Sequence, residues 1–253
     1  MEITHLFVKV EADAPLSPRQ QITLVAPQGI VGDRNGRIGS PRQVLLLDQK
    51  TLDRFALAPG CLRENILCDA LPPGLASGRS LVIGSAHIRL TFLCEPCHYL
   101  NEIQPNLAQR LKNQRGWLGI VTHSGSIQVG DRGEFGPECY PPLAYTARER
   151  FYEFVARIPP GVIVTTADLV VALGVSTAYY RAFPALLKAA QGQCPVHRIV
   201  SKNGELFSRH LPDQARLLQA EGISVTGEHV DLRDRWPPEY FHPNQPLSTP
   251  AQR

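Results

Sequence analysis

A proline-rich break near the middle of the chain constrains its fold more than any other feature. Residues 136–142 read Gly-Pro-Glu-Cys-Tyr-Pro-Pro, without helical or alternating periodicity, and proline removes a backbone donor from any helix or strand. The sequence therefore predicts a linker at 136–146, a domain at 1–135 and a second domain at 147–238. Further prolines at positions 243, 246 and 250 predict a disordered tail over 239–253.

Before the break, short apolar runs separated by turn residues are typical of β structure. The clearest run, His87 to Phe92, alternates as a half-buried strand does, with Ile88, Leu90 and Phe92 on one face. Helical pattern is confined to 48–55 and 106–114. This part is predicted to be mostly β, as a closed or nearly closed barrel. The other predicted strands cover 5–10, 43–47, 80–83 and 119–121.

After the break the pattern becomes helical. Thr146 is placed to cap a first helix, 165–173 forms a second that stops at Gly174, and Ser176 starts a third that reaches about Ala190. Helix, glycine-containing turn and helix together form the outline of a helix-turn-helix. The second domain is therefore predicted to be mainly α and similar to a winged helix-turn-helix.

Composition narrows the class of protein. The chain has 253 residues, is 43% hydrophobic and has a formal net charge of +3, so it has enough apolar residues for a core in each half. No apolar run reaches the roughly 20 residues of a membrane span, and Met1–His5 lacks the features of a secretory signal. We expect a soluble cytoplasmic protein without a membrane partner. The charge neither proves nor excludes a nucleic-acid partner.

Two of the six cysteines form a Cys-x-x-Cys pair, Cys94 and Cys97, directly after the predicted strand 87–92. Six cysteines are too few for a secreted disulfide framework, so free thiols are expected. A thiol on a loop that leaves a strand is placed to act as a ligand or nucleophile. Zinc is a weaker alternative, because no second ligand pair lies nearby. Two ordinary buried cysteines remain the third alternative.

The first half resembles the MOSC domain, the β-barrel module related to the C-terminal part of molybdenum-cofactor sulfurases. Five motifs carry the resemblance in order along the chain. They are Gly29-Ile-Val-Gly-Asp-Arg34, Pro59-Gly-Cys-Leu-Arg-Glu-Asn-Ile66, Gly84-Ser-Ala86, Glu95-Pro-Cys97 and Gly125-Ser-Ile-Gln-Val-Gly-Asp131.

This resemblance implies a molybdenum cofactor. Cys97 matches the thiolate that ligates molybdenum in MOSC enzymes, and soft thiolates suit soft metals. Arg34, Arg63 and Asn65 are implied to contact the phosphate and pterin of the cofactor; a turn-stabilising role is the alternative for these three. Such enzymes reduce N-hydroxylated substrates, including hydroxylamino purines. The loop from Arg34 to Arg42 is shorter than is usual in the family.

The second half resembles the O6-alkylguanine-DNA alkyltransferases. Cys194-Pro-Val-His-Arg-Ile-Val200 matches their active-site signature Pro-Cys-His-Arg-Val, with Val196 where the family has its nucleophilic cysteine. Valine cannot accept an alkyl group, and Cys194 lies two residues away, beyond a proline, so the sequence excludes an active methyltransferase. Ile158-Pro-Pro-Gly161 and the later motifs around Gln214, Glu221, residues 230–232 and Trp236 extend the resemblance over about 147–237.

Loss of the cysteine is typical of alkyltransferase-like proteins, which bind alkylated guanine without repairing it. The resemblance implies base flipping in double-stranded DNA, with Arg181 as the intercalating residue and nucleotide excision repair proteins as partners. Residues 195–198 (Pro195, Val196, His197 and Arg198) would form the lesion pocket, although Arg198 and His197 could be structural. Thr166, Tyr179 and Tyr180 are the remaining predicted DNA contacts.

Three hypotheses follow. In the first, the chain recognises modified guanine in DNA and carries an accessory MOSC module. In the second, it is a molybdenum-dependent reductase of N-hydroxylated purines, and its helical half supplies base or DNA binding. In the third, both halves are inherited folds that now serve as protein-interaction modules.

Overall fold

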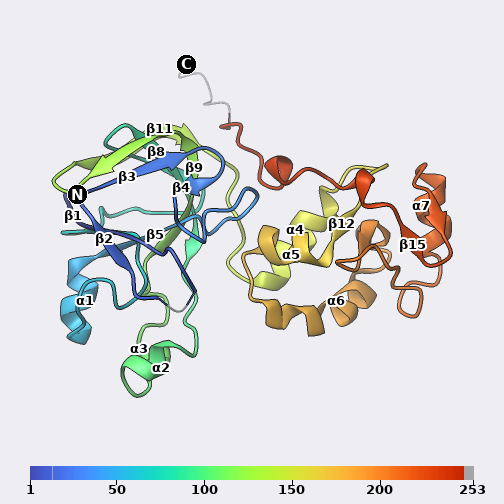
Figure 1. Cartoon of the computed structure of the whole chain (residues 1–253), viewed down its shortest axis with the longest axis horizontal. Coiled ribbons are helices and arrows are strands. Elements are labelled where there is room, and N and C mark those ends of the chain that lie inside the picture. The colour runs from blue at the N-terminus through green and yellow to red at the C-terminus, as the bar shows by residue number, and fades with distance from the viewer. Residues whose placement is uncertain (13, 248–253) are drawn as a thin grey trace. The chain divides into compact units, whose positions relative to one another are not determined.

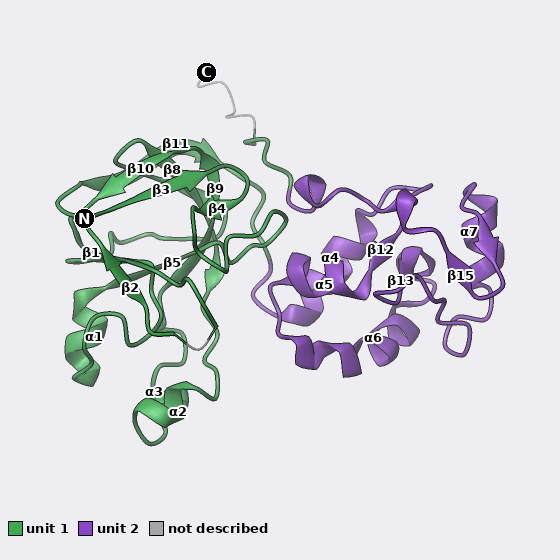
Figure 2. Cartoon of the chain, in the orientation of Figure 1, with its two compact units in different colours: residues 1–143, 243–253 green, residues 144–242 purple. Residues whose placement is uncertain are grey.

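The computed structural model describes residues 1–12 and 14–247, which form two compact units (Figure 2). The first unit comprises Met1–Leu143 and the described residues that follow His242, and Ala144–His242 makes the second. The first is rich in strands and the second is mainly helical (Figure 1). The predicted order of a β domain followed by an α domain is confirmed.

Two sheets build the first unit. The larger has eight strands in the order β11-β7-β8-β9-β5-β6-β1-β2, and the smaller has the order β10-β3-β4. Both contribute to one core, in which Leu24 of the small sheet packs with Leu46, Leu81 and Ile88 of the large one. The strands are β1 (Ile3–Val8), β2 (Ser17–Arg19), β3 (Gln21–Val25), β4 (Gly29–Ile30), β5 (Val44–Asp48), β6 (Ile66–Cys68), β7 (Arg79–Ile83), β8 (Ala86–Leu93), β9 (Trp117–His123), β10 (Gly125–Gln128) and β11 (Gly133–Cys139).

The predicted closed barrel is not found. Neither outer strand of the larger sheet, β11 or β2, closes it through a continuous ladder within the described residues. The start of β1 is nevertheless joined to the segment that enters β11 by the isolated bridge between Glu2 and Arg132. Backbone hydrogen bonds support it, from the Ile3 amide to the Asp131 carbonyl (2.9 Å), from the Gly130 amide to the Ile3 carbonyl (2.8 Å) and from the Gly133 amide to the Met1 carbonyl (2.9 Å). The edge strand β2 has only three residues, which leaves little backbone for closure.

Strand β8 is buried on both faces, and the prediction of a half-buried strand is wrong. Ile88, Leu90 and Phe92 face the apolar side as expected, but Arg89 and Thr91 between them are also fully buried. The Arg89 guanidinium donates to two proline carbonyls, one of them that of Pro243 (2.7 Å), and the Thr91 hydroxyl donates to the Pro41 carbonyl (2.8 Å). Polar groups are buried where they find such partners.

Three short helices cover part of this unit: α1 (Gln49–Phe55), α2 (Leu100–Ile103) and α3 (Leu107–Arg110). The Asp48 carboxylate caps α1 by accepting from the Thr51 amide at 2.9 Å. The helix predicted over 106–114 is shorter than expected, because Asn106 and Asn113 have left-handed φ values of 57° and 62°, which an α-helix does not accommodate.

The second unit is a set of short helices with four two-residue strands. Its elements are α4 (Ala147–Ala156), β12 (Val164–Thr165), α5 (Thr166–Leu173), the 3₁₀ helix η1 (Thr177–Arg181), α6 (Phe183–Ala190), η2 (Val196–Arg198), β13 (Ile199–Val200), α7 (Gln214–Ala220), β14 (Val225–Thr226), β15 (His229–Val230), η3 (Leu232–Asp234) and η4 (Pro238–Tyr240). Thr146 caps α4 as predicted, and Gly174 ends α5 with φ 61°. Thr146 and Thr165 each form a capping box with the acidic residue three positions on.

The helix predicted over 176–190 is broken in two. Pro184 lies in the first turn of α6, where a missing amide hydrogen costs little. The segment before it, including Arg181, is the separate 3₁₀ helix η1. The outline of a helix-turn-helix is therefore α5, η1 and α6, and the antiparallel pair β14–β15 lies where a wing would follow.

The predicted linker and tail both contain ordered structure. Residues 136–139 belong to β11, which bulges there. Phe241 is fully buried and packs edge-on against Phe154, with ring centroids 5.2 Å apart. The Leu247 amide donates to the Cys139 carbonyl. Residues 136–139 of the predicted linker thus form part of β11, and residues 238–242 of the second unit include η4 and the buried Phe241; residues 248–253 lie outside the described residues. No described helix is long and apolar enough to cross a membrane.

Candidate functional site

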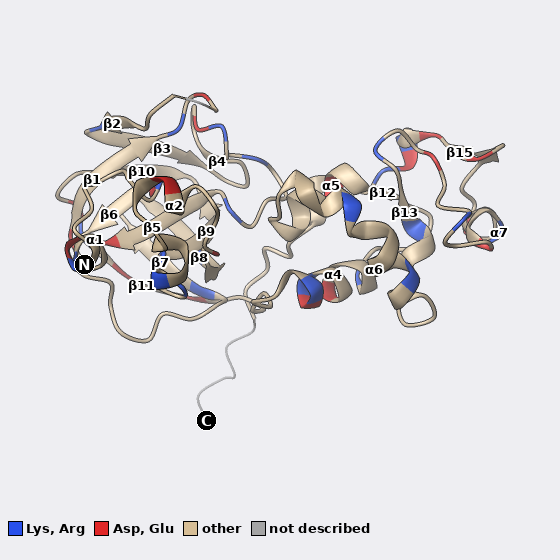
Figure 3. Ribbon diagram, turned by 90° about the horizontal axis from the view of Figure 1, so that it is seen from below, with Lys and Arg blue, Asp and Glu red and all other residues tan. Residues whose placement is uncertain are grey.

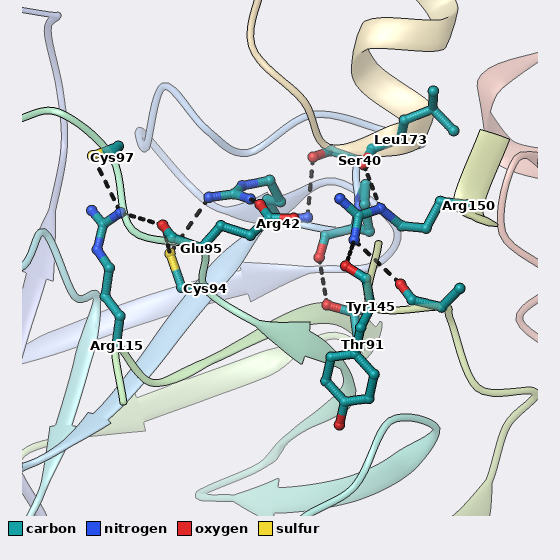
Figure 4. A network of polar contacts seen from close by, with 12 residues as sticks. Ser40, Arg42, Thr91, Cys94, Glu95, Cys97, Arg115, Tyr145, Arg150 and Leu173 are labelled. Carbon is teal, nitrogen blue, oxygen red and sulfur yellow. Dashed lines mark hydrogen bonds and ion pairs between the residues drawn. The ribbon is translucent and has the colours of Figure 1, made fainter. Parts of the chain in front are cut away.

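Cys97 lies on the loop after β8, as predicted, and its side chain is exposed. The nearly buried guanidinium of Arg115 donates to the Cys97 sulfur at 3.3 Å and to the Glu95 carbonyl at 2.8 Å (Figure 4). Arg115 also reaches the Leu62 carbonyl at 3.4 Å. One arginine therefore fixes the loop, supplies positive charge beside the sulfur and ties it to the 59–66 motif.

The second cysteine of the pair has a different environment. Cys94 is 3% exposed, and Arg42 donates to its sulfur at 3.5 Å and to the Glu95 carboxylate at 2.8 Å (Figure 4). The alternative of two ordinary buried cysteines is wrong for Cys97. Among the described residues, no group of three potential metal ligands includes either cysteine, so nothing in the structure favours the zinc alternative.

The predicted cofactor residues divide into two kinds. Arg34 and Arg63 are exposed, and the Arg63 guanidinium lies 3.6 Å from the centroid of the Tyr99 ring. Arg63 itself has a left-handed backbone with φ 62°. Two exposed guanidinium groups on this domain are suited to bind anionic groups such as phosphate.

Asn65 is 4% exposed, and protein groups take up its side-chain amide. Its Oδ1 accepts from the Leu45 amide at 3.0 Å, and its Nδ2 donates to Asp33 at 2.9 Å and to the Phe7 carbonyl at 3.3 Å. Asp33 also accepts from the Lys9 amide. This geometry favours the turn-stabilising alternative for Asn65, which joins the Arg34 loop to β1 and β5.

Glu64 is a buried carboxylate in the 59–66 motif to which the sequence analysis gave no role. It is fully buried, and its carboxylate accepts from the amides of Gly60 at 2.5 Å and Leu62 at 3.1 Å. Burial raises its pKa, against the opposing effect of these amides and of Arg115. The signal was available, because Glu64 lies within the 59–66 motif, whereas no motif pointed to Arg115 or Arg42.

The residues around Cys97 fit the anionic, thiolate-ligated group that the sequence implies. They offer an exposed sulfur, the Arg115 guanidinium beside it and the Arg42 guanidinium, which pairs with Glu95 on the same loop. The Nε atom of Arg115 is buried and has no hydrogen-bond partner among the described residues. An unsatisfied buried donor beside an exposed thiol is consistent with a site that takes a ligand.

In the second unit, Val196 is 2% exposed and packs in the core with Phe154 and Ile158. Its two neighbours in η2 are held by one carboxylate. The His197 Nε2 lies 2.9 Å from Glu221 Oε1, and the Arg198 Nη2 donates to the same oxygen at 2.6 Å. Burial alone would raise the pKa of Glu221, but the hydrogen bonds from Arg198 and His197 outweigh it and lower that pKa to about 2.

Gln214 holds the same segment from α7. Its Nε2 donates to the carbonyls of His197 at 3.0 Å and Ile199 at 2.6 Å, while its Oε1 accepts from the Phe207 amide. Both motif residues, Glu221 and Gln214, thus fix the loop that carries Val196. The roles of His197 and Arg198 shown by these contacts are structural.

Cys194 does not replace the missing nucleophile. Its half-buried thiol lies 3.8 Å from the Ala190 carbonyl at the end of α6. Burial raises the pKa of this thiol, which disfavours the reactive thiolate. Pro195 separates it from Val196.

The predicted DNA contacts are not all exposed. Arg181 and Tyr180 are exposed at the end of η1, and Tyr180 packs edge-on against Phe183 with centroids 6.2 Å apart. Tyr179 is half-buried against the core. Thr166 is only 6% exposed at the first position of α5, because its backbone starts a helix that packs into the core. Its prediction as a DNA contact is therefore not supported.

Two family models match the chain. Residues 19–134 match the MOSC domain, and residues 146–223 match the DNA binding domain of 6-O-methylguanine DNA methyltransferase. No curated protein matches the chain significantly.

Several solved structures are similar to parts of the chain. The YUAD protein from Bacillus subtilis is 15% identical over 52% of this chain and 93% of its own, with a TM-score of 0.45. YiiM from Escherichia coli is 19% identical over 72% and 90%, with a TM-score of 0.43. S. pombe Atl1, in complex with damaged DNA containing O6-carboxymethylguanine, is 20% identical over 36% and 94%, with a TM-score of 0.32. Similarities of this size do not by themselves show an activity.

The sequence motifs, the two units and the two family matches agree in their order along the chain. The chain therefore carries a MOSC domain followed by a DNA-binding domain of the 6-O-methylguanine DNA methyltransferase family.

Proposed function

We propose that the second domain recognises O6-alkylated or otherwise modified guanine in double-stranded DNA and does not transfer the alkyl group. The observation that carries the proposal is Val196 at the nucleophile position of a signature whose supporting contacts remain. Glu221 holds both His197 and Arg198, and Gln214 holds the backbone on the other side. These contacts would hold the segment that lines a guanine site, and valine at position 196 lacks the reactive sulfur.

The charge of the segment around the signature supports a nucleic-acid partner. From Leu169 to Gly204 the chain has no acidic residue, and it carries exposed Arg181, Lys188 and Lys202 besides Arg198, whose charge is paired with Glu221. Figure 3 shows blue without red along α6. A local basic stretch attracts the phosphate backbone even when the net charge of the protein is small.

Exposed side chains on η1 provide what base flipping requires. A protein that extrudes a nucleotide must fill the gap left in the stack. Arg181 has the length to enter it, and the neighbouring Tyr180 ring offers a face or edge on which a base can stack. We propose that the bound lesion then serves as a signal to excision-repair proteins.

Fluorescence anisotropy tests this proposal with two duplexes that differ only in guanine or O6-methylguanine. Salt is held fixed, because phosphate attraction depends steeply on it. We expect at least tenfold tighter binding of the lesion duplex, about 1.4 kcal/mol, and loss of that preference in Arg181→Ala. Arg216→Ala is the matched control, since Arg216 is 70% exposed on α7, away from α5 and α6 (Figure 1).

Equal binding of both duplexes would refute lesion recognition. If Arg181→Ala and Arg216→Ala weaken DNA binding equally, general electrostatic attraction explains the loss. That result would refute the intercalating role of Arg181.

The MOSC domain motivates a second proposal, a molybdenum-cofactor site at Cys97 that reduces N-hydroxylated purines or related compounds. Bound there, the cofactor would supply two-electron redox chemistry. Cys97 would provide the sulfur ligand, Arg115 would orient that sulfur through its 3.3 Å hydrogen bond, and Arg34 and Arg63 would bind the phosphate. The second domain would then bring the site to bases or DNA.

Metal and pterin analysis tests this second proposal on protein expressed in a host that makes the cofactor. We expect molybdenum and pterin in the wild type, loss of both in Cys97→Ser, and retention in Cys139→Ser, which alters another exposed thiol. Wild-type protein without molybdenum and pterin would refute it.

A further inference from the structure

Two histidines and one glutamate come together on the first unit, away from Cys97. The potential ligand atoms of His87, His123 and Glu138 all lie within 4.8 Å of one another. The His87 and His123 ring centroids are 4.3 Å apart, and His87 Nδ1 is 3.4 Å from Glu138 Oε1. His87 lies near the start of β8, whereas Cys97 follows the end of that strand.

The sheet itself brings these residues together. His87 on β8 and His123 on β9 are directly paired in the antiparallel register, so their side chains share one face. The bulge in β11 between Phe135 and Cys139 places Glu138 within reach of His87. A bulge commonly re-aims a side chain at a functional position.

The polar groups of this cluster are incompletely satisfied. His87 Nδ1 is buried and has no hydrogen-bond partner among the described residues. The Ser80 hydroxyl donates to the second oxygen of the Glu138 carboxylate at 3.2 Å. Carboxylates that bind a metal are commonly held by such an outer hydrogen-bond partner. His123 is exposed, so an ion can enter from solvent.

We propose that His87, His123 and Glu138 bind a divalent transition-metal ion of the zinc class. Two imidazoles and a carboxylate suit zinc and its neighbours better than magnesium or calcium. Tetrahedral bonds of about 2 Å hold ligand atoms about 3.4 Å apart, so ligand atoms within 4.8 Å of one another need to close by at most about 1.4 Å. Three protein ligands leave a coordination position open to water or substrate, as in catalytic zinc sites. This site is independent of the guanine and molybdenum proposals.

Isothermal titration with Zn²⁺ tests the proposal on the full chain. We expect one site in the wild type, at least tenfold weaker binding in His123→Ala and in Glu138→Gln, and unchanged binding in two controls. His98→Ala removes a histidine that is 89% exposed beside Glu102, and Cys139→Ser removes the exposed thiol next to Glu138. Circular dichroism checks that each variant folds.

Two results would overturn the site. One is the absence of Zn²⁺ binding by the wild type. The other is wild-type affinity in both His123→Ala and Glu138→Gln, with the loss found instead in Cys139→Ser or Cys97→Ser, which would assign the zinc to thiols.

Discussion

Replacing Glu221 by glutamine should destabilise the second domain in a pH-dependent way. Hydrogen bonds from Arg198 and His197 lower the pKa of Glu221 from 4.5 to about 2. One pKa unit corresponds to about 1.4 kcal/mol, so the charged carboxylate contributes about 3 kcal/mol to the free energy of unfolding. Because the pKa is lower in the folded state, this contribution is complete above pH 4.5 and disappears as the pH falls toward 2.

Chemical denaturation measures this contribution. The chain has two tryptophans, Trp117 in the first unit and Trp236 in the core of the second, so a Trp117→Phe background lets Trp236 fluorescence follow the second domain. At pH 7, Glu221→Gln should unfold with about 3 kcal/mol less free energy than its parent. The two should converge as the pH approaches 2.

Glu205→Gln is the matched control, since it changes a carboxylate in the same domain that is 57% exposed; exposed pairs contribute about 1 kcal/mol or less. A difference between Glu221→Gln and its parent that is constant from pH 7 to pH 2 would refute the reasoning, because it would trace the loss to packing and not to charge.

Three further perturbations address other parts of the chain. Val196→Cys restores a thiol at the signature position beside the His197 frame, and intact mass spectrometry should then detect a methyl adduct after incubation with O6-methylguanine duplex; wild type without an adduct is the comparison. Phe241→Ala removes a fully buried ring whose centroid lies 5.4 Å from that of Trp236. It should lower the free energy of unfolding of the second domain by about 3–5 kcal/mol in the same fluorescence assay; no change would favour the prediction that this segment is disordered. Asn65→Ala removes one of the hydrogen bonds to Asp33 and leaves the Leu45 amide without its side-chain partner. It should cost about 1–3 kcal/mol, measured as a lower melting temperature of the first unit.

Much of the fold could be predicted because its local signals are strong. Alternation in 87–92 located β8, and Thr146 and Gly174 located helix ends through cap chemistry. The burial of Arg89 could not be predicted, because it depends on carbonyls from Pro141 and Pro243, far along the chain. Sequence periodicity carries no information about such distant partners.

The order within the two proline-rich segments also depends on contacts that the sequence pattern does not reveal. Proline disfavours a regular interior strand but is tolerated at a bulge, and Pro137 lies within the bulge of β11. Phe241 follows prolines yet packs against the rings of Phe154 and Trp236. In both cases tertiary contacts, and not local propensity, determine order.

The candidate sites were predictable where a motif named them and not elsewhere. Cys97, Val196 and His197 came from short signatures. Arg115, which donates to Cys97, lies in no signature. Neither do His123 and Glu138, which only the strand register and the bulge in β11 bring close to His87. Thr166 is the opposite case. Its place in a motif predicted a DNA contact, whereas its side chain is only 6% exposed.

The central claim is that the second domain recognises a modified guanine and leaves it unchanged. The most direct measurement isolates the complex with an O6-methylguanine duplex, then quantifies the lesion remaining in the DNA. The account predicts that the duplex is retained at least ten times more tightly than the guanine duplex and is recovered with its methyl group intact. Recovery of demethylated DNA with methylated protein, or equal retention of both duplexes, would contradict it.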